Sequence, residues 1–119
     1  MITIATAQRV AQSWIDAWNQ RDLDAIMEHY SDDVEFWSPL IVKRLGIASG
    51  KIEGKAQLRA YFARGLEAYP NLHFTLLQVL SGVDSITIYY RREDGAEVAE
   101  LTVLDANNRA ILVLSLIHI

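Results

Sequence analysis

The chain has 119 residues, a length typical of one domain, so we treat residues 1–119 as a single unit. Apolar residues make up 51% and charged residues 22%, with a formal net charge of −4, which excludes a disordered chain and lacks the basic excess typical of nucleic-acid binders. The sequence contains no cysteine, which excludes disulfides, thiolate metal sites and cysteine nucleophiles and is compatible with the cytoplasmic location that we expect.

Helical spacing dominates the first half of the chain. Apolar residues including Trp14 and Trp18 recur on one face of a predicted first helix, with Thr6 as the expected N-cap and an end near 19–21. Asp22 is expected to cap a short second helix. The clearest helix is predicted over 55–69, where Pro70 ends it.

The segment between these helices is harder to interpret. The Ser31-Asp32-Asp33 cluster is typical of a turn. A strand is predicted over 34–38, stopped by Pro39. Three glycines punctuate 40–54, so we expect a loop there with at most a short extended piece.

The hydrophobic period changes to two after Asn71, which predicts strands over 72–80, 85–92, 96–104 and 109–117. An Asp-Gly signal marks the turn at 93–95.

The longest uncharged apolar run, 110–119, is far shorter than the roughly 20 residues of a membrane span, so no membrane partner is expected. The absence of charge over 114–119 is unusual for a closing strand; an artefact there stays open, and we assign no function to His118.

Helices in the first half and a strand meander in the second predict an α+β fold. The helices must cover one face of a curved antiparallel sheet, because strands this apolar cannot leave both faces in water. Such a sheet forms a cone with an internal cavity, and the mouth of a cavity is a usual ligand site.

Several segments resemble the nuclear-transport-factor-2-like (cystatin-like) superfamily, which includes SnoaL-like polyketide cyclases and ketosteroid isomerases. The segments are Trp14-Ile-Asp-Ala-Trp18-Asn-Gln-Arg-Asp22, His29-Tyr-Ser-Asp-Asp33-Val-Glu-Phe, Ser38-Pro39, Gly50-Lys-Ile-Glu-Gly54 before the 55–69 helix, and three closing strands with Glu100 in the second. The resemblance covers essentially the whole chain. It implies the cone-shaped fold and a small-molecule pocket, but the superfamily hosts many activities.

The resemblance also implies which residues correspond to the isomerase machinery. The isomerases' carboxylate base corresponds to Ser38, which cannot take a proton from carbon. Their oxyanion-donating tyrosine corresponds to Trp14, and their protonated acid to Glu100. The resemblance therefore argues against isomerisation by that mechanism. The superfamily's epoxide hydrolases use an Asp-Arg-Asp set, which Glu100 with Arg91 or Arg92 imitates only in part.

Glu100 is the sharpest candidate for a catalytic residue. Strand alternation puts Glu100 on one face with Val98 and Thr102, and Ala99 with Leu101 on the other. A carboxyl facing the cavity would have a raised pKa, as a general acid or base requires. Alternatively, Glu100 pairs with Arg91 or Arg92 on the surface of the sheet. Parity alone leaves both readings open, since both faces are fairly apolar.

Three hypotheses remain: a binder of a small apolar molecule, an isomerase, cyclase or hydrolase using Glu100 as general acid or base, and a dimerisation module. We expect a homodimer through the outer sheet face, where Ala99, Leu101 and Val103 lie. The histidine spacing fits no metal site, and no cofactor is expected. The predicted pocket residues, besides Glu100, are Trp14, Trp18, Tyr30, Ser38, Tyr61, Phe62, Phe74, Tyr90 and Thr102.

Overall fold

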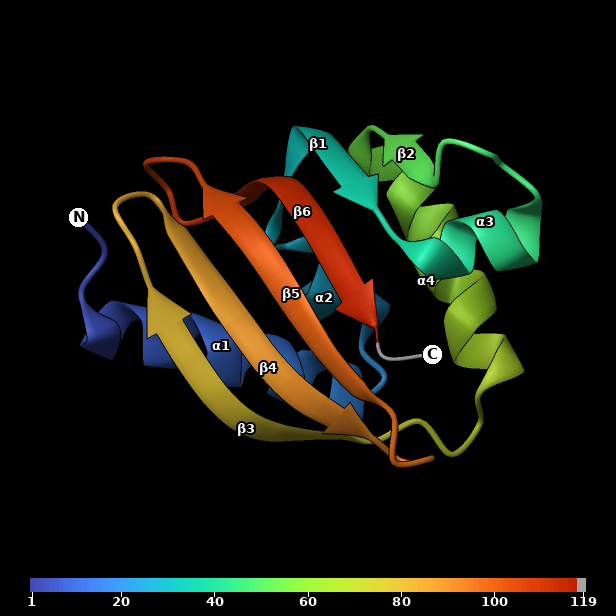
Figure 1. The fold of residues 1–119 in the computed structure, drawn as a ribbon, viewed down its shortest axis with the longest axis horizontal. Helices are drawn as coiled ribbons and strands as arrows, with labels where there is room; N and C mark the ends of the chain where they lie inside the picture. The colour runs from blue at the N-terminus through green and yellow to red at the C-terminus, as the bar shows by residue number, and fades with distance from the viewer. Residues whose placement is uncertain (118–119) are drawn as a thin grey trace.

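The computed structural model describes residues 1–117 as helices packed on a six-stranded sheet (Figure 1). Its elements are α1 (Ile4–Asn19), α2 (Leu23–Met27), β1 (Tyr30–Trp37), α3 (Pro39–Leu45), β2 (Lys51–Glu53), α4 (Lys55–Ala68), β3 (Phe74–Ser81), β4 (Ser85–Arg92), β5 (Glu97–Leu104) and β6 (Ala110–Ile117). The strand order is β2-β1-β6-β5-β4-β3. The predicted α+β fold is confirmed.

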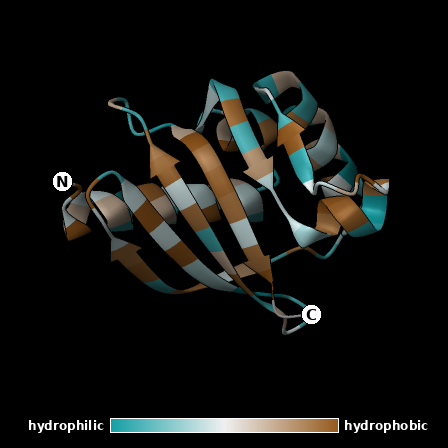
Figure 2. Cartoon of the chain, turned by 45° about the horizontal axis from the view of Figure 1, so that its top comes forward, coloured by the Kyte–Doolittle hydropathy of each residue, from teal (hydrophilic) through white to brown (hydrophobic). Residues whose placement is uncertain are grey.

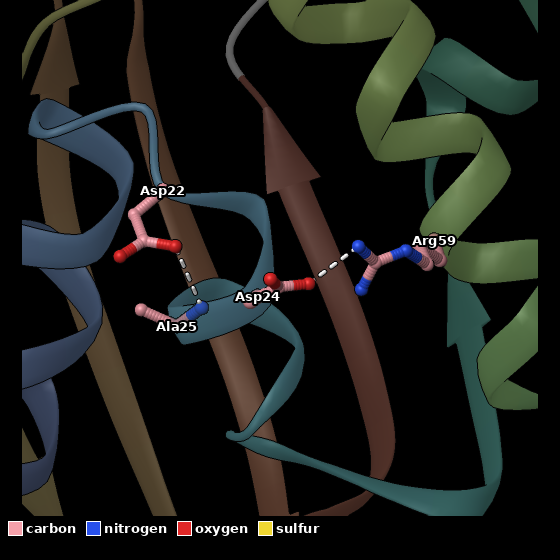
Figure 3. Close-up of polar contacts among 4 residues, drawn as sticks. All are labelled: Asp22, Asp24, Ala25 and Arg59. Atoms are coloured by element: carbon pink, nitrogen blue, oxygen red, sulfur yellow. Dashed lines mark hydrogen bonds and ion pairs between the residues drawn. The ribbon is translucent and has the colours of Figure 1, made fainter.

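The first two helices begin and end where backbone groups find partners. The N-cap of α1 is Thr3, whose hydroxyl accepts from the amide of Thr6 at 3.1 Å. Our choice of Thr6 as the cap was wrong by one turn. Asp22 caps α2 as predicted, accepting from the amide of Ala25 at 3.1 Å. Figure 3 shows this cap beside the exposed Asp24–Arg59 ion pair, which joins α2 to α4.

Strand β1 is longer than predicted. Ser31-Asp32-Asp33 does not form a turn; it lies inside β1, where the pairing with β6 is irregular between Tyr30 and Glu35. Such an irregularity leaves residues between Tyr30 and Glu35 unpaired with β6 without ending the strand. The β1–β6 pair is parallel, so the sheet is mixed, with antiparallel pairing between its other neighbouring strands.

The loop expected over 40–54 is wrong over 40–45, which belong to α3, whereas β2 is the short extended piece that the prediction allowed. The hydroxyl of Ser38 accepts from the amide of Leu40 at 3.1 Å, and Pro39 occupies the first turn. Gly46 ends the helix with φ 67°, the left-handed conformation that glycine adopts freely. Two of the three glycines taken as loop punctuation are therefore helix caps, Gly46 at the end of α3 and Gly54 at the start of α4.

The closing strands follow the predicted meander to within two residues at each end. Helix α1 crosses behind β3, β4 and β5, while α3 and α4 lie toward the β1–β2 edge (Figure 1). Hydrophobic and hydrophilic bands alternate along the strands, and β6 is predominantly hydrophobic (Figure 2). None of the helices in the described part of the chain is long and apolar enough to cross a membrane.

Candidate functional site

A cavity of about 80 Å³ lies between the helices and the inner face of the sheet. The predicted residues that line it are Trp14, Trp18, Ser38, Tyr61, Phe62, Phe74, Tyr90 and Glu100. Tyr30 and Thr102 line a second hollow of about 20 Å³, which shares Trp14 and Glu100 with the first. Glu100 and Trp14 therefore form the partition between a larger and a smaller space.

The alternation of β5 turns Glu100 toward the helices. Val98, Glu100, Thr102 and Leu104 are all buried, whereas Ala99, Leu101 and Val103 between them are half-buried on the outer face. In the register with β4, Ile88 lies opposite Glu100, and Arg91 lies opposite Glu97. The alternative of a surface pair between Glu100 and Arg91 or Arg92 is therefore wrong: Glu100 is buried, and neither arginine forms an ion pair with it among the described residues.

The Glu100 carboxyl is only partly satisfied by hydrogen bonds. Its side chain is 5% exposed. The hydroxyl of Tyr90 donates to Oε1 at 2.9 Å. Oε2 is buried and has no hydrogen-bond partner among residues 1–117. Ser115 lies opposite Glu100 on β6, but its hydroxyl makes no well-formed hydrogen bond to Oε2.

Burial raises the pKa of Glu100 from 4.5 to about 7. The Tyr90 hydrogen bond, the nearby Ser115 hydroxyl and the positive charge of Arg92 oppose this rise, because each favours the carboxylate. Desolvation is the largest effect, so the protonated and charged forms of Glu100 are both populated near neutral pH. A group poised in this way can give or accept a proton.

Two tyrosines near Glu100 are held in the protonated state. Burial and the charge of Glu100 raise the pKa values of both Tyr30 and Tyr90. Tyr30 in turn accepts a hydrogen bond from the indole Nε1 of Trp14 at 2.9 Å. The N–H of Trp14 is therefore already bonded within the protein, although the resemblance aligned Trp14 with an oxyanion donor. The Nε1 of Trp18, by contrast, is buried without a partner among the described residues.

Aromatic rings form the wall of the cavity. Phe74 lies 5.8 Å from Trp14, 5.4 Å from Trp18 and 4.5 Å from Tyr90 between ring centroids. Phe62 continues the cluster, 4.9 Å from Trp18. Such pairs add to the stability gained by burying their area. The wall is consequently closely packed and apolar, which suits a ligand pocket.

Ser38, at the position of the isomerase base, has a structural task. It is 6% exposed, and its hydroxyl oxygen accepts the first free amide of α3. Its own backbone N–H donates to the carbonyl of Gly50 at 2.9 Å. The structure thus offers no carboxylate base at this position.

The sequence reasoning missed Arg44 and Tyr69 as lining residues, and it considered Arg92 only as a partner of Glu100. Arg92 shares the even-numbered face of β4 with Tyr90, so strand parity was a usable signal for it. Arg44 lies in α3, which was not predicted, so no signal was available. Within the described residues, no group of three His, Asp or Glu side chains is placed to hold a metal.

Comparisons with known proteins agree with this fold. The sequence model described as "SnoaL-like domain" matches residues 11–111. A SnoaL-like protein of unknown function from Burkholderia thailandensis is 42% identical, with 98% of each chain covered and a TM-score of 0.95. A search of curated proteins found no match.

More distant structures share the fold alone. A proposed isomerase of the SnoaL-like family from Agrobacterium tumefaciens is 17% identical, with 94% of this chain and 97% of that chain covered and a TM-score of 0.75. A proposed polyketide cyclase from Sinorhizobium meliloti is 11% identical, with 91% and 94% covered and a TM-score of 0.74.

Proposed function

Because the chain belongs to the SnoaL-like family, we propose that it binds a small, mainly apolar molecule in the cavity and holds a polar group of that molecule against Glu100. The observation that carries the proposal is the buried Oε2 of Glu100, which has no partner among residues 1–117. Leaving such an oxygen unsatisfied costs about 1–3 kcal/mol. A ligand that hydrogen-bonds to Oε2 recovers this cost.

The size and chemistry of the cavity support the proposal. A cavity needs roughly 10–15 Å³ to hold one water, so about 80 Å³ leaves room for a small organic group. The aromatic wall offers contact area but few hydrogen bonds, which favours an apolar ligand body. The proposed polyketide cyclase among the structural neighbours is consistent with an organic ligand of this kind.

A second candidate is acid–base catalysis by Glu100 on the bound molecule. The pKa of about 7 favours it, because a catalytic acid or base works best near the ambient pH. Since Ser38 supplies no base, Glu100 alone would remove a proton from one atom of the ligand and return it to another. This requirement favours an isomerase or a cyclase over a hydrolase.

Ligand screening by thermal shift tests the binding proposal, because a molecule that binds only the folded state raises its stability. We expect small aromatic compounds to raise the melting temperature of the wild type. Glu97→Gln is the matched control for Glu100→Gln, since Glu97 lies on the same strand but on the opposite face. A compound that binds through Glu100 should lose affinity in Glu100→Gln only. Equal affinity in all three proteins would contradict the role of Glu100.

Mass spectrometry of the same incubations tests the catalytic candidate. We expect any conversion of a bound compound at pH 7 to fall about 100-fold or more in Glu100→Gln, the usual scale for losing a general acid or base. Glu97→Gln should convert the compound at the wild-type rate. Conversion that persists in Glu100→Gln would rule out this candidate.

The cytoplasmic location and the homodimer remain part of the proposal. The absence of cysteine is compatible with a reducing compartment. The half-buried side chains of Ala99, Leu101 and Val103 form a continuous apolar strip on the outer face of β5, and a second copy would cover it.

A further inference from the structure

Two arginines converge on one tyrosine at the rim of the cavity. Arg44 comes from the last turn of α3, and its guanidinium carbon lies 4.3 Å from the ring centroid of Tyr69. Arg92 comes from the end of β4, and its guanidinium carbon lies 4.7 Å from the same centroid. Arg92 also lies 6.0 Å from the ring centroid of Phe74. Both positive charges therefore lie against the ring of Tyr69, beside the apolar wall.

Neither guanidinium has a carboxylate partner among residues 1–117. The ion pairs of the described chain are Lys51–Glu53 and Arg59–Asp24, both outside the cavity. The Nε–H of Arg92 is buried and makes no hydrogen bond to any described residue. A buried guanidinium donor without an acceptor is costly, so a ligand acceptor at this point would be stabilising.

The cavity is positive in a protein that is negative overall. Among residues 1–117, its lining contains Arg44 and Arg92 but only one carboxyl, Glu100. Burial keeps part of that carboxyl protonated near neutral pH, so Glu100 does not neutralise both arginines. The whole chain has a formal net charge of −4. A local excess of positive charge against this background attracts an anion to the cavity.

The exposure of each lining residue indicates how deep it lies in the cavity. Arg44 is exposed, and Tyr69 and Arg92 are half-buried, whereas Glu100 and Phe74 are buried. The arginines therefore lie at the mouth and Glu100 at the floor, with the aromatic wall between them. A ligand that uses all three regions has an apolar body and one polar group at each end.

We infer that the molecule bound in the cavity is an organic acid, whose carboxylate binds the guanidinium groups of Arg92 and Arg44 at the mouth while its apolar body lies against the aromatic wall. The inference rests on the proposed function and adds the chemical class of the ligand. A planar guanidinium presents parallel N–H donors that match the two oxygens of a carboxylate. Arg92 supplies the buried donor, and Arg44 closes the mouth from α3.

Calorimetry with a matched pair of probes tests the inference. The probes are 3-phenylpropanoate and its neutral analogue 3-phenylpropanamide, which share the aromatic body and differ in charge. We expect the wild type at pH 7.5 to bind the acid at least about 10-fold more tightly than the amide, the scale of one charge-assisted hydrogen bond. The double variant Arg44→Gln/Arg92→Gln should bind both probes about equally.

Arg91→Gln is the matched control, because it removes the same charge from the neighbouring position on β4, and Arg91 is exposed on the opposite face. It should keep the preference for the acid. The Nε–H resonance of Arg92 in the wild type provides a readout that does not depend on how the variants fold. We expect 3-phenylpropanoate to shift this resonance and 3-phenylpropanamide to leave it nearly unchanged.

Each other outcome contradicts a different part of the account. Equal wild-type affinity for the acid and the amide would overturn the organic-acid inference and leave the cavity proposal standing. An acid preference that persists in the double variant, with no shift at Arg92, would place the anion elsewhere and also overturn the inference. Failure of the wild type to bind either probe would count against both the inference and the proposed function.

Discussion

The two faces of β4 and β5 show what the strand alternation accomplishes. The inner face carries Tyr90 and Glu100, both buried beneath the helices. The outer face of the same strands carries Tyr89 and Leu101, which are half-buried. Both faces are mainly apolar in sequence, yet the inner one encloses a buried acid beside a cavity. The informative residue is therefore the buried carboxyl of Glu100 rather than the apolar residues around it.

The largest expected effect comes from removing an aromatic ring from the inner face. Phe74→Ala takes away contacts with three neighbouring aromatic rings, and we expect the free energy of unfolding to fall by about 3–5 kcal/mol. Leu80→Ala on the outer face, where Leu80 is 57% exposed, should cost about 1 kcal/mol or less. Denaturant unfolding measures both. Equal losses would show that the two faces do not differ as described.

Phe74→Leu extends this comparison if Phe74→Ala fails to fold. The leucine keeps part of the apolar contact, so the loss of stability should be smaller than for alanine and still larger than for Leu80→Ala. A Phe74→Leu protein as stable as the wild type would indicate a loosely packed wall.

The next effect is a pH dependence that belongs to Glu100. The folded state raises the pKa of Glu100 from 4.5 to about 7, so between these values the folded protein holds a proton that the unfolded chain has lost. The free energy of unfolding should therefore fall as the pH rises through this window, by up to about 3 kcal/mol. Glu100→Gln should lack this fall and be at least as stable as the wild type at pH 8.

The difference between wild type and Glu100→Gln isolates this contribution. His29, whose pKa is lowered by burial, acts in the opposite direction, but it does so in both proteins. Glu97→Gln should retain the wild-type pH dependence. Parallel stability profiles for wild type and Glu100→Gln between pH 5 and 8 would contradict a buried, titrating Glu100.

The smallest effect on stability is expected for substitutions on the outer face. These should change the oligomeric state of the protein instead. We expect sedimentation at micromolar concentration to give a dimer of the 13.4 kDa chain. Leu101→Lys places a charge on the proposed interface, so it should yield a monomer that still binds cavity ligands. A wild type that sediments as a single 13.4 kDa species would end the dimer proposal.

Local signals in the sequence were sufficient for much of this fold. Asp22 identified a helix cap, and the change of period after Asn71 identified the meander. Strand parity grouped Glu100 with Val98 and Thr102 on one face of β5 but did not show whether that face is the inner or the outer one. Only the packing of the helices on the sheet decided this. Strand parity also indicated the face of Arg92, because Arg92 and Tyr90 are two residues apart on β4 and therefore lie on the same face.

The features that were missed depend on contacts between distant segments. The parallel β1–β6 pair joins the first and last strands, and no local pattern specifies such a partner. Helix α3 has only seven residues, too few for a periodic stripe, and its Ser38 and Gly46 caps are also typical of loops. Because α3 was missed, Arg44 and the arginine pair at the mouth were missed with it.

Carbon-detected NMR titration of the Glu100 side-chain carboxyl tests the central claim most directly, because it measures the environment of this one group. The Glu100→Gln spectrum assigns the resonance by its absence. A buried carboxyl on the cavity floor predicts a pKa of about 7. A value at or below the ordinary 4.5 would show that the group is solvated or fully paired, and would contradict the role given to Glu100.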